Sequence, residues 1–443
     1  MVGISRVISA ADENIQLDYP LQPWVVVLSA ALFFFFEFIQ MNMFNAINPS
    51  LIAAFKVTAT QLGNLSAMYF YGNVSFLFVA GLLLDRFSTR RLLLTAVSIC
   101  VIGTYLFAMS THLWQAEACR FVTGIASTFC MLTAVRLASR WFPPRRIALV
   151  IGLVLTMAMA GGMLAQTPLT YLTRLLGWRH AVMLNASLGI FVTAAIFLWV
   201  KDFPRGAEKT RAREKAHLKA LGFVRSITLA LRNKQNWLAG FYANFLSFPV
   251  VILGASWGSL YLMHVRHLTH LQTSYVTSMI FFGMIFGAPM LGWLSDTIAY
   301  RKMPMIVGAF LTFILIMLIM YLPGLHIPSL MALFFVLGFL AGIQVLAYPV
   351  VVESNSRTIT NTAEGLACTI IMSAGLFQFV YGLLLDANWN GVMSHGLRVY
   401  SASDYQWAAI IFPVSFLVAG VLAFFLKETR GQLISASEIK QNP

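Results

Sequence analysis

The sequence predicts an all-α membrane protein with twelve transmembrane helices, and two observations carry this prediction. Of its 443 residues, 59% are hydrophobic and only 10% are charged, whereas a water-soluble domain has about 25% charged residues. The apolar residues also occur in blocks of about twenty, the length that an α-helix needs to cross a bilayer. The short alternating segments typical of a membrane β-barrel are not the pattern of this chain.

The predicted spans fall into two sets of six, separated by one long polar segment. We expect residues 1–200 to form an N-terminal six-helix bundle and residues 237–443 a C-terminal one, joined by a basic cytoplasmic linker over residues 201–236. Leu221, Val224, Ile227 and Leu231 have helical spacing, so the linker is predicted to end in an amphipathic helix on the membrane surface. The spans cover residues 24–47, 62–84, 92–110, 114–138, 146–169 and 180–200, then 237–262, 272–294, 303–322, 329–349, 363–385 and 405–426.

The basic residues predict the orientation of the chain in the membrane. If both termini are cytoplasmic, 23 of the 30 Lys and Arg residues lie on the cytoplasmic side, five lie outside, and two lie within the fourth span. Basic residues gather on the cytoplasmic side of bacterial membrane proteins. We therefore expect a multi-pass protein of the bacterial inner membrane with both termini in the cytoplasm. The net charge of +14 then reflects topology and the anionic lipid bilayer, and we expect no nucleic-acid partner.

A loop motif occurs twice, once in each half of the chain. Gly81 is followed by Asp85, Arg86, Arg90 and Arg91 after the second span. The loop after the eighth span repeats this pattern 211 residues later, with Gly292, Asp296, Arg301 and Lys302. A second echo pairs Gly152 and Gly162 in the fifth span with Gly365 and Gly375 in the eleventh. Two echoes at nearly one offset predict two structurally similar halves.

With these motifs the chain resembles the major facilitator superfamily of secondary transporters over essentially its whole length. The loop after the second span is similar to the signature motif of that superfamily, and Arg120 to Gly124 resembles its RxxxG element. The resemblance implies two six-helix bundles related by an axis along the membrane normal, a central cavity and alternating access. The segments 139–144 and 177–179 are similar to those of bacterial metabolite and organic-anion carriers.

The repeated loop is suited to act as a gate on the cytoplasmic side. Asp85 can accept hydrogen bonds from backbone N–H groups at the start of a helix in the other half, while Arg86 and Arg90 pair with carboxylates or lipid phosphates. Asp296 and Arg301 hold the matching positions in the second half. The alternative is that these charges only determine topology, which does not explain an Asp at the same position twice.

Glu37 is the most informative residue in the chain. It lies thirteen residues into the first span, about 20 Å from the predicted cytoplasmic end, where an ionised carboxylate costs a few kcal/mol or more. We therefore expect it to face a cavity and to be paired, protonated or hydrated. Gln40 and Asn45 share its helical face, which predicts a partly polar stripe lining that cavity.

The candidate partners of Glu37 are the two arginines of the fourth span, Arg120 and Arg136. They are about 24 Å apart along the helix, so Glu37 could lie at a depth between them. Three roles remain open: Glu37 carries a proton and a neighbouring arginine resets it, or Glu37 and Arg136 hold opposite charges of a substrate, or Glu37 and Arg120 form an ion pair that only fixes packing.

Other polar residues in the spans predict a small polar substrate, although each could instead make an interhelical hydrogen bond. Asp386 and Glu353 lie at span ends and are expected to be structural. His264, His267 and His270 recur every third residue in an external loop without an adjacent carboxylate, so no metal site is predicted. The polar candidates are Gln166, Asn244, Trp257, Gln344, Tyr348 and Gln378.

No nucleotide-binding or hydrolase motif occurs in the sequence, so we expect no enzyme activity and no cofactor. The predicted function is proton-coupled import of a small polar metabolite, such as an amino acid or organic acid, by a monomer. One alternative is a proton-driven exporter of a siderophore or drug, although Met157 and Ala158 stand where drug exporters of the superfamily carry Gly-Pro before Gly161-Gly162. The other alternative is a transporter-like ligand sensor without flux.

Overall fold

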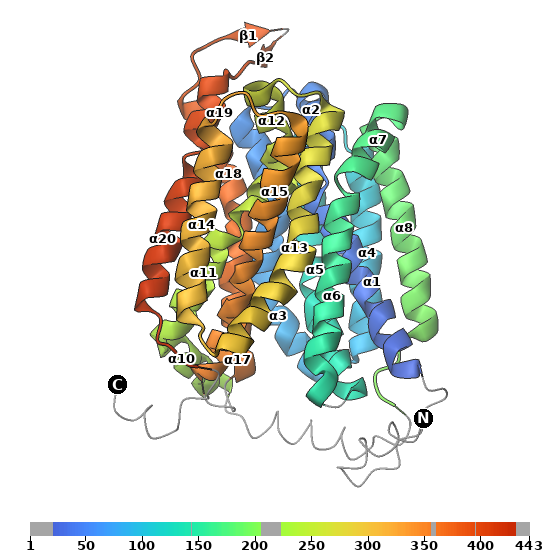
Figure 1. The fold of residues 1–443 in the computed structure, drawn as a ribbon. Coiled ribbons are helices and arrows are strands. Elements are labelled where there is room, and N and C mark those ends of the chain that lie inside the picture. The colour runs from blue at the N-terminus through green and yellow to red at the C-terminus, as the bar shows by residue number, and fades with distance from the viewer. Residues whose placement is uncertain (1–20, 143, 205–222, 356–359, 395, 431–443) are drawn as a thin grey trace.

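The structure is a computed structural model that describes residues 21–142, 144–204, 223–355, 360–394 and 396–430. Some side chains within these ranges, including those of Asp85 and Arg86, lie outside the description. The described residues form a bundle of helices that run in roughly the same direction, with one two-stranded hairpin at one end (Figure 1).

The N-terminal half contains the first six spans. The first span is broken at Met43 into two helices, and the fifth is broken between Leu164 and Thr167, where a new helix begins with Pro168 as its second residue. The helices are α1 (Gln22–Asn42), α2 (Phe44–Phe55), α3 (Ala59–Arg86), α4 (Thr89–Met109), α5 (Leu113–Trp141), α6 (Pro144–Leu164), α7 (Thr167–Leu176) and α8 (Trp178–Trp199).

The C-terminal half repeats this arrangement with more breaks in the helices. Its seventh span consists of α11 (Lys234–Leu246), the π-helix η1 (Pro249–Trp257) and α12 (Gly258–Arg266). The remaining elements are α13 (His270–Ile298), α14 (Lys302–Tyr321), α15 (Ile327–Ala341), η2 (Gly342–Leu346), α16 (Ala347–Glu353), α17 (Thr360–Met372), η3 (Ser373–Leu376), α18 (Phe377–Ala387), β1 (Met393–Ser394), β2 (Leu397–Arg398), α19 (Ala402–Ala408) and α20 (Ile411–Phe425).

The predicted fold class is confirmed. Among the described residues, eleven helical segments are long and apolar enough to cross a membrane. The remaining predicted span lies in α3, whose 28 residues give a length of about 42 Å. Polar residues such as Asn64 and Asn73 lower its hydropathy, and α3 packs between α5 of its own half and α18 of the other half.

The two ends of the bundle are named here by what they carry. Helix α1 begins and helix α20 ends at the same end, which we call the terminal end; the β1–β2 hairpin lies at the opposite end, the hairpin end (Figure 1). Short helix α10 (Phe223–Arg232) lies at the terminal end and packs against α11 and α17. It lies within the predicted linker, although Leu221 is outside the described residues.

The glycine echo in the sequence marks the places where the two halves cross. Gly162 on α6 faces the ring of Phe281 on α13, and Gly375 in η3 faces the ring of Phe70 on α3. A Cβ atom at either glycine would overlap the facing ring. Phe70 and Phe281 are buried and are themselves 211 residues apart, so the same contact is made twice, once by each half's copy of the repeat.

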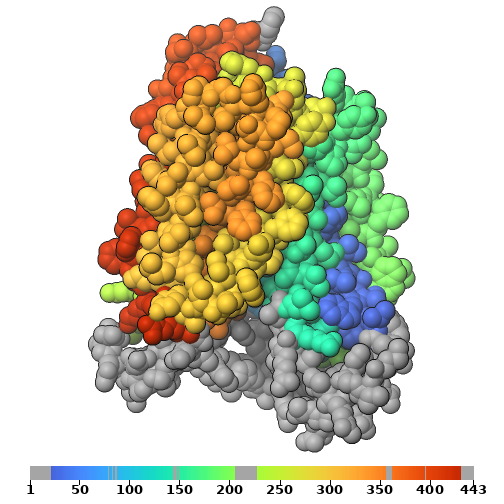
Figure 2. Space-filling model, in the orientation of Figure 1, coloured from blue at the N-terminus to red at the C-terminus, as the bar shows by residue number. Residues whose placement is uncertain are grey.

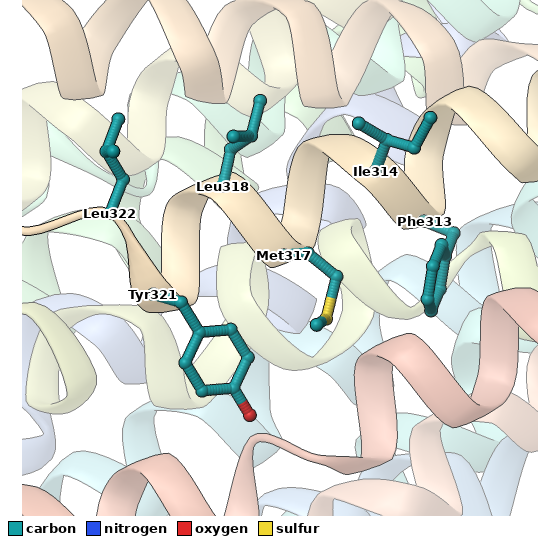
Figure 3. Close-up of a pocket in the computed structure, with 6 residues that line it drawn as sticks. All are labelled: Phe313, Ile314, Met317, Leu318, Tyr321 and Leu322. Atoms are coloured by element: carbon teal, nitrogen blue, oxygen red, sulfur yellow. The ribbon is translucent and has the colours of Figure 1, made fainter.

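The outer faces of the bundle carry the apolar surface expected against lipid. On α14 and α20 large side chains such as Phe310 and Phe424 are exposed, and Figure 2 shows the helices of both halves packed side by side into one body. A shallow groove on α14 is lined by Phe313, Ile314, Met317, Leu318, Tyr321 and Leu322 (Figure 3). With a single hydroxyl group at its rim, this groove does not offer the hydrogen bonds that a polar metabolite needs.

Candidate functional site

Glu37 lies inside the N-terminal bundle. Its side chain is only 1% exposed, and its Oε2 accepts a hydrogen bond from the Tyr69 hydroxyl on α3, at 3.1 Å. The thiol of Cys100 on α4 lies beside the carboxyl group, and Oε1 has no hydrogen-bond partner. All of these neighbours belong to the N-terminal half, so the expectation that Glu37 faces a cavity shared by the two halves is wrong.

Arg120 on α5 reaches Glu37 through Tyr69. Its guanidinium group lies over the Tyr69 ring, 4.8 Å from the ring centroid, and over the Phe44 ring at 4.9 Å. Its Nη1 donates to the backbone oxygen of Gln40 at 3.0 Å, while Nε and Nη2 have no partner. Tyr69 therefore links the carboxylate to the cation, and the two do not form the direct ion pair that was one of the predicted alternatives.

Of the other residues predicted for this site, Gln40 lies close to Glu37 and Arg136 lies far from it. The side chain of Gln40 is buried one turn after Glu37 and its Nε2 has no hydrogen-bond partner. Arg136 lies sixteen residues from Arg120 on α5, about 24 Å toward the terminal end. Arg120 is therefore the cation of the Glu37 site, and Arg136 is not in contact with it.

A second polar cluster joins the two halves at the hairpin end, where side-chain amides bond to backbone carbonyls of η1. Asn45 Nδ2 donates to the oxygens of Leu253 and Gly254, both at 2.6 Å. Gln166 Nε2 donates to the Gly254 oxygen at 2.8 Å, and Asn48 Nδ2 donates to the Ser256 oxygen at 2.5 Å. We call these bonds of α2 and Gln166 to η1 the amide seal.

The π-helix explains why the carbonyls of η1 are available to the amide seal. Pro249 at its start has no N–H to donate, and the wider turn of a π-helix distorts the ordinary ladder of backbone hydrogen bonds. A carbonyl oxygen has two lone pairs and can accept a second donor. Buried carbonyls within a membrane-spanning segment need such partners, and the other half supplies them.

Hydroxyl groups and further amides extend the amide seal. Gln166 Oε1 accepts from Thr277 on α13 at 2.8 Å, and Asn45 Oδ1 accepts from the Ser259 backbone N–H at 3.1 Å. The side chains of Ser66 on α3 and Gln378 on α18 bond to each other across the halves at 2.5 Å, and Gln378 Nε2 donates to the oxygen of Val251 in η1 at 2.6 Å.

The hydrogen bonds between the halves are confined to the hairpin end. All of those found among the described residues join α2, α3, α7 or Gln166 to η1, α12, α13, α18 or Tyr400. His270 contributes one of them, with Nε2 2.9 Å from the Asn45 oxygen. No described hydrogen bond joins the halves at the terminal end.

The remaining polar candidates of the C-terminal half bond within that half. Trp257 Nε1 donates to the Gln378 oxygen at 3.0 Å, and Asn244 Nδ2 donates to the Ile370 oxygen at 2.6 Å. Gln344 Nε2 lies 3.9 Å from the Met284 sulfur, and the Tyr348 hydroxyl lies beside the thiol of Cys368. These contacts are interhelical, which is the alternative that the sequence left open for each, and a role of these residues in substrate binding stays a prediction.

Three of the five predicted gating residues have described side chains, and each contacts its own half. Arg301 is 8% exposed and pairs with Asp296 at 2.5 Å and with Glu353 at 3.0 Å. Burial lowers the pKa of Arg301, but its hydrogen bonds to Glu353 and Asp296 outweigh this and raise the pKa above its usual value. Arg90 donates from Nη2 to the Phe197 oxygen. The side chains of Asp85 and Arg86 lie outside the described residues, so the cross-half latch of Asp85 stays a prediction.

A pair of helix caps that repeats between the halves was not predicted from the sequence. Asp202 accepts from the backbone N–H of Arg90 and from the Ser88 hydroxyl, at the start of α4. Glu428 accepts from the N–H groups of Arg301 and Lys302, at the start of α14. The signal was present as Lys-Asp after the sixth span and Lys-Glu after the twelfth, and a carboxylate at a helix start is stabilising.

Residues 30–378 of the chain match the Major Facilitator Superfamily. The chain is 27% identical over 268 residues to a protein named AraJ from Escherichia coli (strain K12), a match that covers 60% of this chain and 63% of that relative. It is 24% identical over 322 residues to the 4-hydroxybenzoate transporter PcaK from Pseudomonas aeruginosa, covering 66% of this chain and 70% of that relative.

The fold is also similar to solved structures. The inward open conformation of the xylose transporter XylE from E. coli matches with a TM-score of 0.73 over 94% of this chain and 99% of that chain, at 15% sequence identity. At so low an identity, this structural similarity supports the fold alone and carries no information about the substrate.

Proposed function

The chain belongs to the Major Facilitator Superfamily, and on this premise we propose that it is a secondary active transporter that imports a small polar metabolite together with protons across the bacterial inner membrane. Residues 1–200 and 237–443 are the two bundles that rock against each other, and residues 201–236 are the linker between them. The protein works as a monomer, because each chain carries both bundles.

The single observation that carries this proposal is the one-sided closure of the two halves. The amide seal joins them at the hairpin end, and the described residues make no such bond at the terminal end. Among the described residues, most of the Lys and Arg between the spans lie at the terminal end, so the positive-inside rule assigns that end to the cytoplasm. The conformation is then closed to the outside. Hydrogen bonds from neutral side-chain amides suit a reversible closure, since hydrogen bonds to water can replace them when the amide seal opens.

Glu37 is the proposed proton site, and its surroundings suggest how protonation reaches the amide seal. When Glu37 is ionised, it attracts Arg120 across the Tyr69 ring. Protonation removes that attraction and leaves Arg120 held mainly by Gln40 and Phe44. These two residues flank the break at Met43 between α1 and α2, and α2 carries Asn45 of the amide seal. A change of charge at Glu37 thereby acts on the orientation of α2.

The proposed substrate class is a small polar metabolite, with organic acids as the first class to test. The transporter PcaK is named for 4-hydroxybenzoate, an aromatic carboxylate. Arg136 is the proposed anion contact, because it is a cation on α5 that is only partly buried and lies on the side away from the amide seal. The drug-export alternative lacks a comparable observation in this structure.

The test is uptake by proteoliposomes that contain the purified protein. Aromatic carboxylates, sugar phosphates and amino acids are screened with and without an inward proton gradient, in the wild type and in Glu37→Gln. The matched control is Glu117→Gln, a carboxylate of the same half that accepts only from Asn64 at 2.8 Å in the described structure.

The proposal predicts gradient-stimulated uptake that Glu37→Gln loses and Glu117→Gln keeps, while exchange of substrate across the membrane without a gradient survives in Glu37→Gln. Full gradient dependence in Glu37→Gln would remove Glu37 from the proton pathway. Saturable binding without flux would instead establish a ligand sensor, and proton-driven efflux would establish an exporter.

A further inference from the structure

The start of helix α3 is held by residues of the opposite half. Thr60, the second residue of α3, donates its backbone N–H to Asp386 Oδ2 at 2.8 Å. Ala59, the first residue, donates its N–H to the Tyr400 hydroxyl oxygen at 2.9 Å. Asp386 lies in the last turn of α18, and Tyr400 follows strand β2 of the hairpin. Two elements of the C-terminal half therefore close over one helix start of the N-terminal half.

These two N–H groups are the ones that α3 cannot satisfy by itself. The first N–H groups of any helix lack partners within the helix. Thr58 and Gln61 form a capping box, in which the Thr58 hydroxyl takes the Gln61 N–H and the Gln61 side chain takes the Thr58 N–H. The N–H groups of Ala59 and Thr60 remain, and they point to the carboxylate and the hydroxyl of the other half.

Asp386 is fixed in place by the hairpin segment. Its Oδ1 accepts from the Tyr400 hydroxyl at 2.5 Å and from Arg398 Nη1 at 2.9 Å. The negative charge of this carboxylate lies at the start of α3, where the helix dipole favours an anion. Burial and the hydrogen bond to Asp386 raise the pKa of Tyr400 above its usual value, so Tyr400 remains a neutral donor to Asp386 while it accepts from Ala59.

We propose that Asp386 is a positioning residue for transport: with Arg398 and Tyr400 it forms a latch on the first two residues of α3 that holds the hairpin end closed and must be released when that end opens. This inference rests on the proposed function. The latch holds the start of α3, and Asp85, near the other end of α3, is predicted to accept from the start of a helix in the other half at the terminal end. Helix α3 would then take part in a carboxylate latch at each end, made alternately.

The chain offers a matched control for this latch in the same segment. Asp404 is a buried carboxylate that, like Asp386, accepts a backbone N–H at a helix start, from Ser401 at 2.7 Å, together with a bond from Asn388 at 3.1 Å. All of its partners belong to the C-terminal half. Loss of the Asp404 charge therefore perturbs the same loop and the same chemistry without touching the contact between the halves.

The test measures the separation of the two halves directly, without a substrate. Spin labels are attached to cysteines at Arg174 on α7 and Ser329 on α15, which are exposed and lie outside the latch, in a background that lacks the four native cysteines and retains uptake. Pulsed electron paramagnetic resonance then gives the populations with short and long label distances at the hairpin end, which correspond to its closed and open forms.

Asp386→Asn removes the charge and the pairing with Arg398. Ala59→Pro removes one N–H donor on the other side of the latch, and proline is favoured at the first position of a helix. A hydrogen bond to a charged group stabilises the closed form more than a hydrogen bond between neutral groups. Asp386→Asn should therefore raise the ratio of open to closed form about tenfold. Ala59→Pro should raise it about threefold, and Asp404→Asn should leave it unchanged.

A ratio unchanged by both Asp386→Asn and Ala59→Pro would overturn the latch, as would an equal rise in Asp404→Asn. If Asp386→Asn does not fold, Ala59→Pro alone decides. The proposed transport function fails differently: the wild type would then show one distance under all conditions, with and without a proton gradient.

Discussion

Removal of the Asn45 side chain tests the amide seal most directly. Asn45→Ala deletes two donor bonds of 2.6 Å, to Leu253 and Gly254, and the acceptor of the Ser259 N–H. Each bond contributes about 1 kcal/mol net of the water that replaces it, so the closed hairpin end loses about 3 kcal/mol. Since 1.4 kcal/mol is a factor of ten, we expect the open form at that end to gain about one hundredfold.

The assay is the reactivity of a reporter cysteine that the closed form buries. Ser274 is 1% exposed in the first turns of α13, so Ser274→Cys should react with a membrane-impermeant thiol reagent only when the hairpin end is open. While the closed form predominates, the reaction rate is proportional to the open population, and Asn45→Ala should raise it by one to two orders of magnitude.

Asn42→Ala is the matched control for Asn45→Ala. Asn42 is equally buried three residues earlier, but its side-chain amide donates to Phe38 of its own helix. A reaction rate within twofold of the parent in Asn45→Ala would refute the reasoning. So would an equal acceleration in Asn42→Ala, because the effect would then come from disturbance of α1 and not from the contact with η1.

Three further substitutions test the contacts around the site. Gly375→Ala should drive a methyl group into the ring of Phe70 at a cost of about 1–3 kcal/mol, seen as slower uptake that a second change, Phe70→Leu, restores in part. Arg301→Met leaves Glu353 buried without its cation and should destabilise the purified protein by about 3–5 kcal/mol, measured as a lower Tm. Asp296→Asn should change the same Tm little, because the Asp296 side chain is 67% exposed and exposed ion pairs contribute about 0–1 kcal/mol; a larger fall would give Asp296 a role in holding Arg301.

The features of the fold that depend on hydropathy were predictable from the sequence. Twelve spans in two sets follow from apolar blocks of the length that a bilayer requires, and the offset of the repeated loop predicted two similar halves. The glycine echo was also visible in the sequence, but its meaning was not. Only the structure shows that Gly162 and Gly375 receive the rings of Phe281 and Phe70.

The direction that Glu37 faces could not be predicted. A carboxylate at mid-depth must avoid lipid, but this condition is met equally by a cavity between the halves and by the interior of one bundle. The predicted polar stripe from Glu37 to Asn45 requires that these residues lie on one regular helix. The break at Met43 separates the two residues, so Glu37 bonds within its own half and Asn45 bonds across to η1.

The partners of the amide seal could not be predicted from the sequence, because they are backbone carbonyl groups, which every residue has. Asn45, Gln166 and Gln378 were predicted as substrate contacts from their polarity, and such residues in a membrane are expected to find a partner. In the structure each of them bonds to η1. A π-helix has no strong sequence signature, so the segment over residues 249–257 is indistinguishable in the sequence from any apolar span.

The two kinds of contact between the halves differ in what movement they permit. The hydrogen bonds at the hairpin end are directional, and each is lost when its atoms separate by more than about an ångström. The ring-to-glycine contacts of Phe70 and Phe281 have no such requirement, because dispersion attraction is non-directional and the missing Cβ atom leaves the backbone free to roll over the ring. Rocking that conserved the two ring contacts and exchanged only the amide seal and the Asp386 latch would break few interactions at any one time. The duplicated sequence thus places a permissive contact at each crossing of the halves and a specific one at the hairpin end, which opens in the proposed transport cycle.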